Sequence, residues 1–353
     1  MPYQSSITER LKSYLPTTIL IWLAILFYRT NKYYSSWLSS ETQSALIWLA
    51  LAYTLIGFIF FVIFSFRKEK ESRGLTLIRI LKRLLRDTHN YIHNFTSKPN
   101  HPLPKIDPKE KTILLFVLVK IFFLPLMLNF FFDNIHSVAA HFTNWQNISL
   151  LFSISSFNTI LFPLLLSLLL TIDTSFFIFG YSIESSKLKN QVRSVEPTFF
   201  GWIVALICYP PFNDFINNYL GWYANDYTFF WTNELTVIMR ILILFSYGIY
   251  VWASVALGAK ASNLTNRGIV SRGPYAIVRH PAYISKNFAW CLSILPVLTV
   301  ASFWQILIII ATTTVWIFIY YLRAITEERH LIKDPDYQAY CRKVKYRFIP
   351  GVY

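Results

Sequence analysis

The sequence predicts an all-helical membrane protein that crosses the bilayer about eight times. Three observations predict it. The chain of 353 residues is 54% hydrophobic and only 14% charged, whereas soluble domains carry about 25% charged residues. Its apolar residues gather in runs close to the roughly 20 residues that a transmembrane helix needs. Its Lys and Arg residues concentrate in alternate connecting segments, as in multi-pass membrane proteins.

The apolar runs give the expected order of spans. We predict helices at Leu15–Tyr28, Ala45–Phe66, Thr112–Phe132, Leu150–Ile172, Phe199–Tyr219, Leu235–Gly258, Ile284–Val300 and Phe303–Leu322. The stretch 149–183 is too long for one span and contains Pro163 and Asp173. We expect Asp173 near the lipid head groups; inside the bilayer it would be a functional residue. Arg240 is expected to extend toward the interface.

The distribution of positive charge predicts the orientation. Lys and Arg occur in 67–111, 184–198, 259–283 and the tail from Arg323, and neither occurs in 133–149 or 220–234. By the positive-inside rule both termini are cytoplasmic. The net charge of +15 accompanies no recognisable nucleic-acid-binding module, so no nucleic-acid partner is predicted. The oligomeric state is not predicted.

Four segments are expected: 1–66, 67–111, 112–258 and 259–353. In the second, Leu77, Leu81 and Leu84 share one helix face and basic residues fill the other. Such a helix is typical of a segment that lies on anionic membrane lipids, although a solvated basic loop has the same pattern. His89 and His93 could share a face, but no acidic or cysteine ligand lies close to them, and we predict no metal site.

The fifth span is interrupted at residues 208–212, where Pro210 and Pro211 follow each other. Proline removes a backbone donor and clashes with the preceding turn, which kinks or ends a helix. Freed carbonyl groups at membrane depth need partners in protein or in a cavity. The break is therefore either a simple kink or part of a substrate cavity.

Two polar clusters bracket the last pair of spans. The first contains Gly273-Pro274-Tyr275 and Arg279-His280-Pro281-Ala282-Tyr283. The second contains Arg323, Glu327 and Glu328, of which Arg323 and Glu327 share a helix face because they lie four residues apart. A hairpin of two spans brings both clusters to one membrane face. There they could hold a zwitterionic ligand.

From about Lys260 to Tyr353 the sequence resembles the isoprenylcysteine carboxyl methyltransferase family, which is similar in turn to phospholipid methyltransferases. The resemblance implies a methyltransferase core at 259–353 with S-adenosylmethionine bound on the cytosolic side. It implies cofactor contacts for the backbone of Arg267, Gly268, Ile269 and Val270, and for Tyr275, His280, Pro281, Ala282, Tyr283 and Glu327. It implies a substrate role for Arg323.

The chemistry of these side chains agrees with that function. Glu327 can pair with the cofactor's amino group, and His280 with nearby backbone donors can hold its carboxylate. A lipophilic, lipid-like acceptor is expected, and a carboxylate is the acceptor group that the family suggests. A carboxylate needs no general base, whereas an amine would have to lose a proton, for which Glu328 is the candidate catalytic residue.

Two features keep other functions open. Many relatives have Gly two residues after the motif tyrosine, whereas Tyr283 is followed by Ile284, Ser285 and Lys286, and Lys286 could alter the substrate mouth. The tail 340–353 resembles membrane sterol reductases, which use NADPH and share the Arg-His-Pro-x-Tyr motif. The alternatives are therefore a sterol reductase-like enzyme, a phospholipid amine N-methyltransferase and a non-catalytic membrane scaffold.

Overall fold

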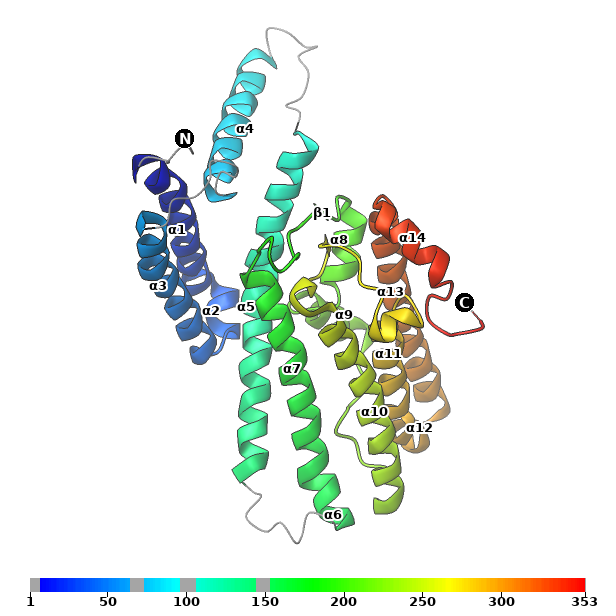
Figure 1. The fold of residues 1–353 in the computed structure, drawn as a ribbon. Coiled ribbons are helices and arrows are strands. Elements are labelled where there is room, and N and C mark those ends of the chain that lie inside the picture. Colours follow the sequence, from blue (N-terminus) through cyan, green and yellow to red (C-terminus); the bar gives the residue numbers. More distant parts are fainter. Residues whose placement is uncertain (1–6, 64–72, 96–105, 144–152, 353) are drawn as a thin grey trace. The chain divides into compact units, whose positions relative to one another are not determined.

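The computed structural model describes residues 7–63, 73–95, 106–143 and 153–352, and these residues form a nearly all-helical protein (Figure 1). Contacts within the chain divide it into two units, Met1–Asn129 and Phe130–Tyr353. The predicted division into four segments is not tested by this structure. The family resemblance and both polar clusters fall in the second unit.

The first unit contains the N-terminal helices. They are α1 (Ile7–Thr30), α2 (Lys32–Trp37), α3 (Ser40–Ile63), α4 (Arg73–Phe95) and the beginning of α5 (Pro108–Thr143). The predicted amphipathic helix is α4, and it buries Leu77 and Ile80 in the unit. Leu81 and Leu85, by contrast, are exposed. The predicted segment 67–111 extends beyond α4 into 67–72 and 96–105, which lie outside the described residues.

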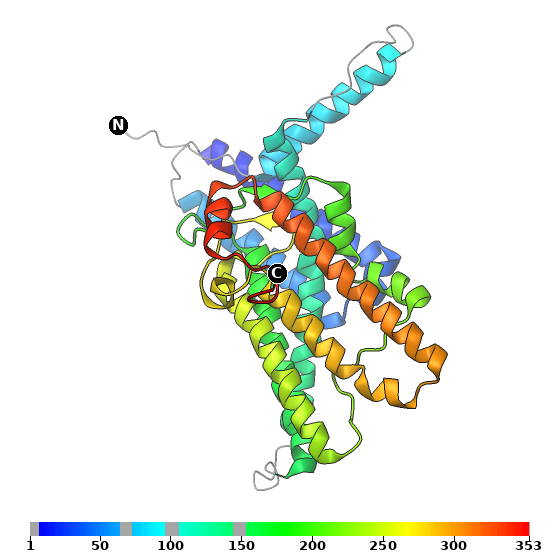
Figure 2. The same cartoon turned by 90° about the vertical axis from the view of Figure 1, so that its right-hand side faces the viewer.

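The second unit contains the remaining elements. They are α6 (Ile154–Ser156), a π-helical turn (Phe157–Leu161), α7 (Phe162–Ser182), β1 (Ser194–Val195), α8 (Phe199–Leu206), α9 (Phe212–Leu220), α10 (Asn233–Leu257), a turn at Gly258–Lys260, β2 (Thr265–Asn266), a turn at Gly273–Ala276, α11 (Pro281–Ser293), α12 (Leu295–Val300), α13 (Phe303–Leu331) and α14 (Pro335–Lys343). Figure 2 shows α14 and the C-terminal residues beside the start of α11.

Six helices among the described residues are long and apolar enough to cross a membrane. They are Ser40–Ile59, Pro108–Phe142, Ile154–Ser182, Asn233–Lys260, Pro281–Val300 and Phe303–Leu331. The first predicted span corresponds to a shorter apolar helix, Tyr14–Thr30, and the fifth is divided into α8 and α9. The chain is a multi-pass membrane protein, while the count of eight spans stays a prediction.

The core of the second unit lies where α7, α10 and α11 meet. Phe162, Ile243, Tyr247 and Ala289 are buried together there. Large apolar side chains such as Phe245 on α10 point outward and are exposed. An apolar surface of this kind is costly in water and is normal in lipid. The helix bundle therefore buries an interior and presents a lipid-compatible exterior.

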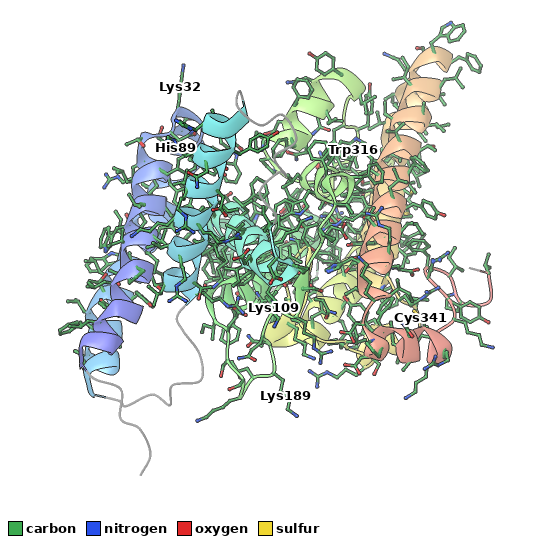
Figure 3. All side chains as sticks on the ribbon, turned by 90° about the horizontal axis from the view of Figure 1, so that it is seen from above. Lys32, His89, Lys109, Lys189, Trp316 and Cys341 are labelled. Carbon is green, nitrogen blue, oxygen red and sulfur yellow. The ribbon has the colours of Figure 1, made fainter. Side chains whose placement is uncertain are left out.

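The loops that were predicted to lie inside meet at one end of this unit. β1 pairs antiparallel with β2, with Ser194 opposite Asn266 and Val195 opposite Thr265, which joins loop 184–198 to loop 259–283. Arg193 also forms ion pairs of 2.9 and 2.6 Å with Asp334 and Asp336 of the tail. In the same loop Lys189 points away from the helices (Figure 3). The observed grouping agrees with the predicted sharing of one face.

A glycine makes this junction possible. A Cβ atom on Gly180, in the last turn of α7, would lie 1.9 Å from the carbonyl oxygen of Ala261. Side chains do not approach a carbonyl oxygen so closely, so only glycine allows the segment after α10 to cross α7 here. The crossing places residues 262–265 against the cavities described below.

Two charged residues of the predicted spans, Arg240 and Asp173, are buried inside the protein. Arg240 does not extend toward an interface. It is buried, and it donates hydrogen bonds to the carbonyl oxygens of Tyr227 and Thr228 in the preceding loop. Carbonyl oxygens supplied by an irregular segment satisfy the guanidinium inside the protein. Asp173 is buried too, where it accepts hydrogen bonds from Tyr250 and Ser254 of α10; its depth in a bilayer stays a prediction.

Candidate active site

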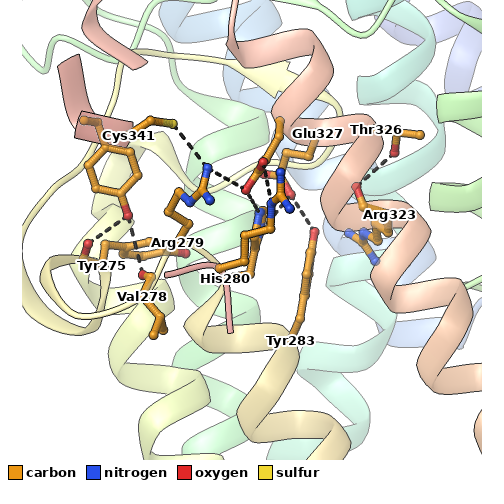
Figure 4. A network of polar contacts seen from close by, with 12 residues as sticks. Tyr275, Val278, Arg279, His280, Tyr283, Arg323, Thr326, Glu327 and Cys341 are labelled. Carbon is orange, nitrogen blue, oxygen red and sulfur yellow. Dashed lines mark hydrogen bonds and ion pairs between the residues drawn. The ribbon is translucent and has the colours of Figure 1, made fainter. Parts of the chain in front are cut away.

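The two polar clusters meet where α11 begins and α13 ends, as Figure 4 shows. The hydroxyl group of Tyr283 donates a 2.8 Å hydrogen bond to Glu327. The ring of His280 stacks on that of Tyr283, with centroids 5.4 Å apart. Its Nε2 atom lies 3.2 Å from a carboxylate oxygen of Glu328. The predicted hairpin therefore brings both clusters together.

His280 stands at the break before α11 because of the proline that follows it. Pro281 occupies the first position of the helix, and His280 keeps a non-helical backbone with ψ 58°. The freed amide of His280 donates to the carbonyl oxygen of Arg347 over 2.9 Å, and that of Arg279 donates to Tyr346 over 3.0 Å. The C-terminal tail thus fastens this break in place.

Glu328 is enclosed by positive groups. Its carboxylate lies 3.2 Å from Arg279 and 2.9 Å from Arg347, in addition to its contact with His280. Only 10% of its side chain is exposed, and it lines neither cavity described below. Both of its oxygens therefore already contact cationic or histidine groups of the protein. The placement differs from that expected of a catalytic base.

Tyr275 is held by the tail through its backbone. The hydroxyl group of Tyr340 on α14 donates a 2.8 Å hydrogen bond to the carbonyl oxygen of Tyr275. The side chain of Tyr275 packs on the buried cluster of Tyr337, Tyr340 and Val344. Burial raises the pKa of the Tyr275 phenol, so it stays neutral. Tyr275 can therefore offer a ring face and a neutral hydroxyl group.

The larger of two cavities, here called the main cavity, has an empty volume of about 660 Å³. Five of the predicted residues, with Arg323, line it. They are Tyr275, His280, Ala282, Tyr283 and Glu327. Further walls come from Phe177, Tyr209, Tyr250, Ser254, Leu257, Ser262, Asn263, Arg279, Lys286 and Tyr320. Six of the sixteen lining residues are therefore Phe or Tyr, and four others carry charge.

Arg323 is buried in this wall between aromatic rings. Its guanidinium carbon lies 5.3 Å from the ring centre of Tyr283 and 5.4 Å from that of Tyr209, distances at which a cation is attracted to a ring. It also donates a hydrogen bond to the side-chain oxygen of Asn263. The backbone and side-chain amides of Asn263 in turn donate to the hydroxyl group of Tyr181, over 2.7 and 2.9 Å. Arg323 is thus positioned by a connected set of buried polar groups.

A second cavity of about 430 Å³ adjoins the first. Ser262, Asn263, Tyr283, Arg323 and Glu327 line both cavities. Its far wall includes Glu196, which precedes α8. Arg323 and Tyr283 therefore stand between the two cavities.

Other predicted residues lie apart from the cavities. Residues 267–270 line neither of them. The buried guanidinium of Arg267 bonds to Ser262 and to the carbonyl oxygen of Asn190, over 2.9 and 3.0 Å, and Ile269 packs against the tyrosines of α14. Pro281 is buried and begins α11. In this geometry these residues support the site and do not face its interior.

With this geometry in view, the chain can be compared with known protein families. Residues 235–333 match the isoprenylcysteine carboxyl methyltransferase family. The matched segment runs from α10 to the end of α13, so it includes His280, Tyr283, Arg323 and Glu327. It supports a membrane methyltransferase activity. A comparison with curated proteins found no significant match.

The family match does not reach every wall of the main cavity. Phe177 comes from α7 and Tyr209 from the proline break, both before residue 235. The break therefore contributes to a cavity, one of the two possibilities that the paired prolines left open. Asn263 and Tyr320 had no signal of their own in the sequence. Only the buried polar contacts of Arg323 identify Asn263.

Proposed function

We propose that this protein transfers a methyl group from S-adenosylmethionine to a lipophilic acceptor that reaches the site from the membrane. The observation that carries the proposal is the main cavity itself. It gathers Tyr275, His280 and Tyr283 from one cluster and Arg323 and Glu327 from the other around one space. The family match over the same helices supports the same reaction class.

The residues present fit S-adenosylmethionine. The Glu327 carboxylate is 46% exposed and can pair with the cofactor's amino group. His280 lies close by and can contact its carboxylate. The neutral phenol rings of Tyr275 and Tyr283 offer faces to an adenine ring or to a positive sulfonium. When bound, the cofactor supplies an electrophilic methyl group, and these side chains orient it and limit the access of water.

We assign Arg323 the task of orienting an anionic acceptor, in the form of a carboxylate. Methyl transfer then forms one carbon–oxygen bond and breaks one sulfur–carbon bond, and no proton has to leave the nucleophile. Neutralisation of opposite charges in a dry site favours this step, so correct placement supplies most of the acceleration. The pairing of Arg323 with Asn263 and with the tyrosine rings provides that placement.

We assign Glu328 a positioning role in place of the predicted catalytic one. Its contacts with Arg279, His280 and Arg347 join the start of α11, the end of α13 and the tail. Loss of that carboxylate would release His280 and the tail together. A carboxylate acceptor, already ionised at neutral pH, makes a base at this position unnecessary.

The membrane setting completes the proposal. We propose that both termini and the cofactor end of the site face the cytoplasm, as the Lys and Arg distribution predicts. Helix α4 exposes Leu81 and Leu85 next to basic residues such as Lys82 and Arg86. We propose that this helix lies on anionic membrane lipids. The acceptor would enter from the bilayer between helices.

Transfer of radiolabelled methyl to membrane lipid tests the proposal. Purified protein in nanodiscs is incubated with methyl-labelled S-adenosylmethionine and a total lipid extract, and the lipid phase is then treated with alkali. We expect label in the lipid that alkali releases as methanol, because methyl esters hydrolyse in base. Alkali-stable label would indicate an amine or thiol acceptor. No incorporation with any lipid class, together with NADPH oxidation by added sterols, would replace the proposal with the reductase alternative.

A further inference from the structure

A lysine inside the main cavity has no role in the reaction as described so far. Lys286 lies on α11 one turn after Tyr283, and it lines the main cavity. A charged residue inside a membrane protein is costly, and it usually faces a bundle interior or a ligand path. We therefore expect the Lys286 ammonium to have an acceptor or counterion, in the protein or in a ligand.

The neighbours of Lys286 are ring faces. Its ammonium nitrogen lies 5.5 Å from the ring centre of Tyr250 and 5.2 Å from that of Trp290. Across the described parts of the chain, no side chain or carbonyl group forms a hydrogen bond or ion pair with this ammonium. Ring faces attract a cation but leave its three N–H donors unused. Those donors are available to an oxygen atom of a ligand in the cavity.

Asp173 is the acid that interacts most strongly with Lys286, and its carboxylate already accepts two hydrogen bonds. Asp173 on α7 accepts hydrogen bonds from the hydroxyl groups of Tyr250, over 2.9 Å, and of Ser254. It interacts with Lys286 electrostatically but forms no ion pair with it within 4.0 Å. The negative charge thus offsets part of the cost of placing a cation here. It leaves the ammonium free to bind.

Lys286 and Arg323 line the same cavity from facing helices, α11 and α13. Glu327 is the carboxylate in that wall, and it lies beside His280 and accepts from Tyr283. The remaining lining cation outside the histidine, Arg279, is paired with Glu328. The acidic end therefore suits an amino group, and the region between Lys286 and Arg323 suits an anion.

We propose that Lys286 is a specificity-determining residue that binds the acidic head group of the acceptor and disfavours an amine. The inference rests on the proposed function, since it names the acceptor of that same site. Lys286 attracts the anionic head into the aromatic part of the cavity, next to Arg323. An ammonium head group would meet two like charges there, which costs binding energy in a low-dielectric site.

Competition for photolabelling tests this directly and needs no turnover. Protein in nanodiscs is labelled with a photoactivatable fatty acid, and palmitic acid, hexadecanol and hexadecylamine compete at equal concentrations in the bilayer. We expect palmitic acid to compete about tenfold better than hexadecanol, the preference that one charged contact supports, and hexadecylamine to compete worst. Lys286→Met should remove the preference for the acid, and Lys286→Arg should keep it.

Two further variants separate recognition from a structural effect. Lys187, exposed in the loop after α7, provides the control Lys187→Met, which should retain the wild-type preference. Asp173→Asn removes the offsetting negative charge. Its amide oxygen can accept from one of the two hydroxyl groups, and the other hydroxyl group can turn to accept from the amide NH2. The variant should therefore strengthen the preference for the acid, which loss of packing alone would not do. Should Lys286→Met fail to fold, Lys286→Gln and Asp173→Asn carry the test.

The results also distinguish this inference from the proposed function. S-adenosylhomocysteine binding is measured on the same samples and should be unchanged in Lys286→Met. Absence of that binding, with an acid preference that depends on Lys286, would overturn the methyltransferase and retain the acidic subsite. An acid preference that survives in Lys286→Met, or a wild-type protein with no preference among the three competitors, would overturn the role of Lys286.

Discussion

Replacement of Glu327 by glutamine removes one charge from the cofactor end of the site and leaves its shape unchanged. The glutamine oxygen can still accept the hydrogen bond from Tyr283 that now measures 2.8 Å, so the side chain should keep its place. What changes is the attraction between Glu327 and a cationic amino group. The variant therefore isolates one contact.

The expected magnitude follows from the exposure of the carboxylate. A hydrogen bond to a charged group contributes about 1.5–3 kcal/mol. Glu327 is 46% exposed, so solvent screening reduces the contribution to the lower part of that range, about 1.5–2 kcal/mol. This free energy corresponds to a 10- to 30-fold increase, roughly, in the dissociation constant for S-adenosylhomocysteine.

Calorimetric titration of detergent-purified protein with S-adenosylhomocysteine measures this change. Asp336→Asn is the matched control, since Asp336 is a carboxylate that is 62% exposed and lines neither cavity. It should bind like wild type. An unchanged dissociation constant in Glu327→Gln would show that Glu327 does not contact the cofactor, and the assignment of this end of the cavity would be refuted.

Three other predictions follow from single contacts. Arg323→Lys keeps the charge but loses the planar guanidinium group that faces Asn263 and the tyrosine rings. We therefore expect turnover to fall roughly 10- to 100-fold while S-adenosylhomocysteine binding is retained. Equal losses of turnover and binding would place Arg323 in the cofactor site. Gly180→Ala would set a Cβ atom 1.9 Å from the Ala261 oxygen, and we expect it to destabilise the protein by about 1–3 kcal/mol in thermal unfolding. The control Gly248→Ala, whose added Cβ would meet no atom within 4 Å, should leave the stability unchanged. Equal melting temperatures of the two variants would contradict the close crossing of α7 by the segment after α10. Burial alone would raise the pKa of Asp334, but hydrogen bonds from Asn266, the Asp336 backbone and Arg193 outweigh it and lower that pKa below 3.8. The stabilisation is therefore complete above the unfolded pKa and is lost as the pH falls below about 4. Asp334→Asn should reduce the dependence of the melting temperature on pH over that window. The same dependence in wild type and variant would count against the contacts of Asp334 with Asn266 and Arg193.

The periodic and compositional features of this chain were predictable from sequence because they depend on local physics. Apolar runs located α3, α5, α7, α10 and α13, and proline rules located both the break at 208–212 and the start of α11. The Arg-His-Pro-x-Tyr motif and the Arg323–Glu327 spacing identified most of the charged cavity wall. Each of these signals acts within a few residues of the chain.

The features that could not be predicted depend on distant partners. Glu327 and Glu328 were both predicted to serve the site directly, whereas Glu327 lines the cavity and Glu328 lies against Arg279 and Arg347. Arg240 was expected to extend toward the interface because it lies near one end of the predicted span Leu235–Gly258. Its partners come from a loop more than two helical turns away along the chain. Tertiary contacts decide such roles, and periodicity does not reveal them.

The measurement that tests the account most directly is titration of the wild-type protein with S-adenosylhomocysteine and, in a separate experiment, with NADPH. The account predicts that S-adenosylhomocysteine binds and NADPH does not, since the cavity pairs one exposed carboxylate with aromatic walls. Binding of NADPH alone would contradict it and support the reductase alternative. Binding of neither, in lipid nanodiscs as well as in detergent, would contradict it in favour of a non-catalytic membrane scaffold.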